Sequence, residues 1–149
     1  MAKVSIKGVL LGGILDIVSS MILGIPLVVY AIASANLVNV PKDQLGAAIT
    51  ASIHARPPLY ALQLLIGAAC TTFGAYMSAR IAKHDELLNG FLSSFVCVLT
   101  GIYAVASGKD TSSTLTLIGL FALTLASGLF GGYLRARSVA KRALLAGPV

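Results

Sequence analysis

The segment VLLGGILDIVSSMILGIPLVVYAIA, residues 9–33, decides the fold class, because Asp16 is the one charged residue in it. The segment exceeds the roughly 20 residues that an α-helix needs to cross a hydrocarbon core of about 30 Å. In lipid it must be helical, because a single helix satisfies its own backbone hydrogen bonds. The apolar region of a secretory signal peptide is shorter, at roughly 7–15 residues. We therefore expect a retained transmembrane helix.

Three further apolar segments of similar length follow, at residues 59–82, 87–107 and 113–134. The chain is 57% hydrophobic and 11% charged, whereas a soluble domain carries about 25% charged residues. This composition predicts an all-α integral membrane protein, a bundle of four transmembrane helices. We expect one transmembrane domain over residues 1–149, with a basic tail at 135–149.

The Lys and Arg residues predict how the spans are oriented. Eight of them lie near the ends of the spans that would share a side with both termini, and three lie near the opposite ends. Loops on the cytoplasmic side carry an excess of Lys and Arg. We therefore expect a multi-pass protein with its N- and C-termini in the cytoplasm. The eight are Lys3, Lys7, Arg80, Lys83, Arg135, Arg137, Lys141 and Arg142, and the three are Lys42, Arg56 and Lys109.

The connections between the spans differ in length. KHDE at 83–86 predicts a tight turn in which Asp85 is the N-cap of the next helix. GKDTS at 108–112 predicts a second short turn. The loop at 34–58 is longer, and its PKDQLGAAITASIHA segment has an apolar residue at every fourth position, namely Leu45, Ile49 and Ile53. That spacing predicts a short amphipathic helix, which either lies on the outer membrane surface or caps the bundle.

Two similar motifs close the second and fourth spans. FGAYMSAR at 73–80 and FGGYLRAR at 130–137 match in five of eight positions. The match predicts a parallel repeat of two helical hairpins. Tyr suits the membrane interface and Arg reaches headgroups, so structural anchoring is the simpler interpretation and a ligand site is the alternative. We expect contacts with lipid headgroups, anionic at the cytoplasmic face, from Tyr76, Arg80, Tyr133, Arg135 and Arg137.

Several stretches together resemble small bacterial membrane proteins of the YrzE type. They are KGVLLGGILD at 7–16, GAYMSARIAKHDELLNGFLSS at 74–94 and GGYLRAR at 131–137, in a layout of four short spans. The resemblance implies a location in the bacterial plasma membrane and brings no catalytic residues with it. The loop at 34–58 departs from the pattern of the most compact members.

Asp16 lies on the smallest and most polar stripe of the first span. Residues four apart share a helix face, and this stripe comprises Gly8, Gly12, Asp16, Ser20 and Gly24. The opposite side is apolar, so we expect the carboxyl group to point into the bundle or toward a partner. Similar stripes of small residues on the other spans allow helices to approach closely. We expect helix packing at Gly8, Gly12, Gly24, Gly74, Gly128 and Gly132.

Counting inward from the span ends predicts which polar groups share the depth of Asp16. An Asp at the centre of a membrane helix costs about 2.5–3.5 kcal/mol on insertion scales, and nearby hydroxyl groups would reduce that cost. The alternatives for Asp16 are a structural polar contact, proton or cation handling, and contact with another subunit. The predicted intramembrane polar site consists of Asp16, Ser19, Ser20, Thr72, Ser94 and Ser127.

These patterns favour a small structural or accessory membrane protein that packs against itself or a larger membrane complex through its glycine-rich faces. The alternative is a small transporter or channel that couples to protons or cations through Asp16. An enzyme is the least favoured class, since the chain has no HExxH, GxSxG or P-loop motif. Cys70 and Cys97 are expected to act as small packing residues. We expect no cofactor, no metal and no nucleic acid as a ligand.

Overall fold

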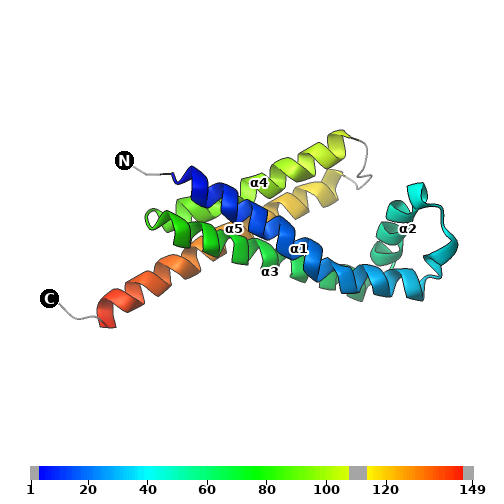
Figure 1. Cartoon of the computed structure of the whole chain (residues 1–149), viewed down its shortest axis with the longest axis horizontal. Coiled ribbons are helices and arrows are strands. Elements are labelled where there is room, and N and C mark those ends of the chain that lie inside the picture. Colours follow the sequence, from blue (N-terminus) through cyan, green and yellow to red (C-terminus); the bar gives the residue numbers. More distant parts are fainter. Residues whose placement is uncertain (1–3, 108–113, 146–149) are drawn as a thin grey trace. The chain divides into compact units, whose positions relative to one another are not determined.

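The computed structural model describes residues 4–107 and 114–145, and within them its regular elements are all helices (Figure 1). The all-helical fold class is therefore confirmed. The elements are α1 (Ile6–Ser34), the short 3-10 helix η1 (Leu37–Asn39), α2 (Lys42–His54), α3 (Pro57–Ala82), α4 (Glu86–Ala106) and α5 (Thr114–Leu145).

Four of these helices, α1, α3, α4 and α5, are long and apolar enough to cross a membrane. This finding confirms the four predicted apolar helices. The largest difference is in α5, which continues to Leu145 instead of ending near residue 134. Residues 135–145 contain neither Gly nor Pro and are rich in Ala, Leu, Lys and Arg, which are good helix formers. The basic tail is therefore largely a continuation of the last apolar helix.

The contacts divide the chain into two compact units, which we describe separately. The bundle unit comprises Met1–Val18 and Ala68–Val149, and the hairpin unit comprises Ser19–Gly67. The bundle unit holds the first part of α1, most of α3, and all of α4 and α5 within the described residues. The hairpin unit holds the second part of α1, η1, α2 and the start of α3.

Glycine allows backbones to touch inside the bundle unit. A Cβ built on Gly12 would lie 2.7 Å from the carbonyl oxygen of Gly74, and one on Gly90 would lie 2.7 Å from the Cα of Gly132. The first contact joins α1 to α3, and the second joins α4 to α5, which run side by side in Figure 1. The interior of this unit is consequently built on backbone proximity more than on large apolar side chains.

The turn between α3 and α4 is as short as the KHDE motif predicts. Lys83 and Asp85 both adopt positive φ, at 60° and 44°. Asp85 occupies the N-cap position of α4, but its side chain makes no capping hydrogen bond. The expected mechanism of capping is therefore wrong, because a residue in the left-handed region does not direct its side chain at the first amides of the helix as an extended N-cap does. The predicted GKDTS turn lies outside the described residues.

In the hairpin unit, the apolar side of α2 packs inward. Ile53 is buried together with Leu27 and Ala31 of α1, and Ile49 and Leu59 pack against this cluster. The periodicity of α2 is thus explained by packing within its own unit.

Arg56 connects the start of α3 to the end of α1 in the hairpin unit. Its guanidinium donates to Ser34 Oγ at 2.6 Å and to the Ser34 carbonyl oxygen at 3.3 Å. Arginine at this position suits the negative end of the helix dipole and satisfies a carbonyl group that has no partner in the helix.

Candidate functional site

Asp16 is buried in the bundle unit, with 4% of its surface exposed. The glycines beside it make this possible. A Cβ built on Gly74 of α3 would lie 2.8 Å from the Cβ of Asp16 and 2.6 Å from the carbonyl oxygen of Gly12. The carboxyl group therefore lies on the packed side of α1, in the direction that its stripe predicts, while Leu10 and Ile14 remain about half exposed.

The thiol of Cys97 contacts the carboxyl group of Asp16. Cys97 Sγ donates a hydrogen bond to Asp16 Oδ2 over 2.9 Å, which joins α4 to α1. The two helices are also closely packed beside this contact. A Cβ on Gly13 of α1 would lie 2.7 Å from the Cβ of Val96, the residue before Cys97 on α4. Cys97 is half-buried, and its weak S–H donor makes a specific contact in addition to the packing role expected of it.

Two of the hydroxyl groups predicted around Asp16 have other acceptors. Thr72 Oγ1 donates to the Ser127 carbonyl oxygen at 3.4 Å, and Ser94 Oγ donates to the Phe91 carbonyl oxygen at 2.7 Å. A hydroxyl group has one hydrogen to donate, so neither group also donates to the carboxyl group. The Thr72 bond instead joins α3 to α5. Ser19 and Ser20 lie in the hairpin unit and are half-buried, whereas Ser127 is buried in the bundle unit.

Most of the predicted packing glycines approach another helix within the bundle unit. A built Cβ would come closer than 3.0 Å to an atom of another helix at Gly8, Gly12, Gly74, Gly128 and Gly132. Gly24, in the hairpin unit, differs, because a Cβ there would meet no described atom within 4 Å. The close-packed stripe of α1 therefore does not extend to Gly24, and its predicted role in packing within the chain is corrected.

Gly131 was not predicted, although it lies next to Gly132. A Cβ on Gly131 would lie 2.7 Å from the Cβ of Ala75 on α3. The double glycine thus gives α5 two packing faces, one for α3 and one for α4. Gly131 is the counterpart of Gly74 in the two similar motifs, yet Gly74 packs against α1 and Gly131 packs against α3.

Asn89 is a second polar centre, which the sequence analysis missed. Its side chain is fully buried. Its Oδ1 accepts from the Ser5 amide at 2.7 Å, and its Nδ2 donates to the carbonyl oxygens of His84 and Asp85 at 2.9 and 3.1 Å. Its own carbonyl oxygen accepts from Ser78 Oγ at 3.0 Å. One residue thus ties together the start of α1, the end of α3 and the turn into α4.

The residues expected at lipid headgroups lie in two kinds of environment. Arg80, Tyr133 and Arg137 are exposed, as headgroup contact requires. Tyr76 and Arg135 are half-buried, and Arg135 Nε is buried without a hydrogen-bond partner among the described residues. Arg135 is therefore only partly directed toward the surroundings of the protein.

Among the described residues, no group of three His, Cys, Asp or Glu side chains is arranged to hold a metal ion. Comparison of the chain with protein-family models, with curated proteins and with solved structures finds no match.

The contact between Asp16 and Cys97 is expected to stabilise the fold by about 1 kcal/mol, the typical net contribution of a hydrogen bond. A double-mutant cycle with Asp16→Ala and Cys97→Ala should give a coupling energy of this size in the free energy of unfolding. Cys70, which is also buried, provides the control. Equal coupling of Asp16 to Cys70→Ala and to Cys97→Ala would mean that the hydrogen bond contributes nothing specific.

Proposed function

We propose that this chain is a small integral membrane protein in the bacterial plasma membrane, with both termini in the cytoplasm. Support comes from the length and apolar character of α1, α3, α4 and α5. The distribution of Lys and Arg supports the orientation, and the resemblance to YrzE-type proteins supports the bacterial membrane. Exposed apolar side chains such as Leu10, Ile14 and Val18 suit contact with acyl chains.

Within that membrane, the proposed role is structural or accessory. The observation that carries this proposal is the packing around Asp16. Gly12 and Gly74 bring two backbones so close beside the carboxyl group that not even a methyl group fits. An acid enclosed in this way holds helices together and has little room for a hydrated ion. We propose no catalytic activity for this chain, since it has no HExxH, GxSxG or P-loop motif.

The proposed partner is a second copy of the chain or a larger membrane complex. The packing glycines of the bundle unit are already used within the chain, so a partner needs other small residues. Gly24 is open, and Leu23 and Ile25 beside it are exposed. A glycine among exposed apolar residues lets a foreign helix approach closely.

The basic residues are proposed to hold anionic lipids at the cytoplasmic face. Arg137, Lys141 and Arg142 are exposed along the last turns of α5. Each such charge near an anionic surface contributes about 1 kcal/mol.

The mass of the protein purified in mild detergent tests the proposed role. We expect assemblies heavier than the 15.3 kDa chain, or a reproducible partner in native-membrane pull-downs. Gly24→Leu should weaken the association, whereas Gly46→Leu, at another open glycine, should not. A strict monomer from which nothing co-purifies would rule the proposal out.

The alternative function is a small proton- or cation-coupled transporter or channel. The observation in its favour is the buried acid of Asp16 with a thiol donor beside it, since acids inside membrane helices are often functional. Flux measurements in liposomes separate the two functions. The structural role predicts no coupled flux for the native chain. Coupled flux that Asp16→Asn abolishes would establish the alternative.

A further inference from the structure

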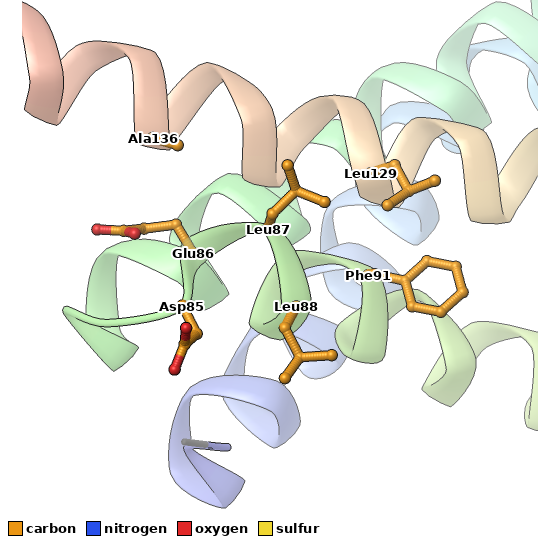
Figure 2. A pocket seen from close by; sticks show the side chains of 7 residues that line it. All are labelled: Asp85, Glu86, Leu87, Leu88, Phe91, Leu129 and Ala136. Carbon is orange, nitrogen blue, oxygen red and sulfur yellow. The ribbon is translucent and has the colours of Figure 1, made fainter. Parts of the chain in front are cut away.

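A shallow groove lies between the start of α4 and α5, within the bundle unit. Its volume is about 420 Å³, and Leu88 and Phe91 of α4 and Leu129 of α5 line its apolar part. Figure 2 shows the carboxyl groups of Asp85 and Glu86 at one end of this set and Phe91 and Leu129 at the other. The groove is therefore polar and acidic at one end and apolar at the other.

We propose that this groove binds a phospholipid with a primary ammonium headgroup, of the phosphatidylethanolamine type. The ammonium lies at the Glu86 carboxylate, and an acyl chain lies against Phe91 and Leu129. This inference rests on the membrane location proposed above.

The charges favour this headgroup. Arg80, Lys83 and Arg137 are exposed cations of the bundle unit. The groove, in contrast, begins at two carboxylates, the exposed Asp85 and the half-buried Glu86. Charge-assisted hydrogen bonds to a carboxylate need N–H donors, which a primary ammonium has and a quaternary ammonium lacks. Ala136 lines the groove and is followed in the chain by the exposed Arg137, a cation that suits the phosphate of the same headgroup.

The spacing along α4 fits the same molecule. Phe91 follows Glu86 by five residues, which corresponds to about 7.5 Å along a helix. That is a step from the headgroup level into the hydrocarbon. Phe91 is held edge-on by Phe95, with ring centroids 5.1 Å apart, and Leu129 opposite it is 40% exposed. The Phe91 side of the groove is thus held in position, and the Leu129 side is open to lipid.

The chain contains no Trp, so a single introduced Trp reports on the groove without background. Phe91→Trp is reconstituted in liposomes of phosphatidylcholine and phosphatidylethanolamine. In the first arm the phosphatidylethanolamine carries bromine as the quencher, and in the second arm the phosphatidylcholine carries it. We expect an apparent preference of about threefold for phosphatidylethanolamine, as for one partly exposed ion pair. Adding Glu86→Gln should abolish the preference. Phe73→Trp, at an exposed position of α3 that does not line the groove, is the control and should show none. Leu129→Trp provides a second reporter on the opposite wall.

The possible results separate the two proposals. Equal quenching of Phe91→Trp and Leu129→Trp by both lipids, with or without Glu86→Gln, would overturn the headgroup assignment while leaving the membrane location intact. Stronger quenching by brominated phosphatidylglycerol would also overturn it, since the basic residues would then select the lipid. No quenching of any of the Trp variants by any brominated lipid would contradict the membrane location itself.

Discussion

Gly74→Ala is expected to lower the free energy of unfolding by about 1–3 kcal/mol, the usual cost of overpacking a well-packed interior. The added methyl group would lie 2.6 Å from the Gly12 carbonyl oxygen and 2.8 Å from the Asp16 Cβ. The first is a backbone atom, so α1 and α3 would have to separate. Elsewhere in a helix the same substitution favours folding, because alanine is a better helix former than glycine by about 1 kcal/mol.

The same helix offers a control with the opposite expected sign. A Cβ on Gly67 of α3 would meet no described atom within 4 Å, so Gly67→Ala should leave stability unchanged or raise it by up to about 1 kcal/mol. Both variants can be followed by circular dichroism during titration of detergent micelles with sodium dodecyl sulfate. If Gly74→Ala proves as stable as Gly67→Ala, then the close approach of α1 and α3 does not exist.

Hydropathy was sufficient to predict the four long helices, because length and apolar composition leave no other structure in lipid. The direction of Asp16 was also predictable, since residues four apart share a helix face. The residue that Asp16 contacts on α4, Cys97, was not predictable in the same way. Counting depth from the predicted ends pointed to Ser94, but α1 begins at Ile6 instead of residue 9. The level of Asp16 therefore moves along α4, from Ser94 to Cys97.

Asn89 shows a different limit of sequence reasoning. In ELLNGFLSS, residues 86–94, a single amide near the start of a span looks like a residue at the membrane surface. Its partners are backbone groups of Ser5, His84 and Asp85, and backbone groups have no signature in sequence. One available signal was that the short KHDE turn contains no glycine, and in the structure two of its residues indeed take positive φ. A turn of that kind is stable only when neighbouring groups hold it.

Asn89→Leu is expected to lower the free energy of unfolding by about 3 kcal/mol, because each buried polar group left unsatisfied costs about 1–3 kcal/mol. Leucine is similar in size, but it removes the acceptor for the Ser5 amide and both donors to the turn. Ser93→Ala is the control on the same helix. Ser93 is also buried, at 2% exposed, but its hydroxyl donates to the Gly90 carbonyl oxygen of α4 itself, so its loss should cost less than about 1 kcal/mol.

Hydrogen exchange distinguishes the loss of the Asn89 side-chain hydrogen bonds from a general packing defect. In Asn89→Leu, the amide of Ser5 and the turn at 83–85 should exchange faster than in the native chain, while amides in the middle of α5 should keep their protection as long as the protein stays folded. A uniform increase along all the helices would instead mean that the variant loosens the whole bundle. Asn89→Leu with the stability of Ser93→Ala would show that the three hydrogen bonds of Asn89 do not hold the start of α1 to the turn. The contacts between α1 and α3 would then depend on the glycines alone, and Gly74→Ala should by itself detach the first part of α1.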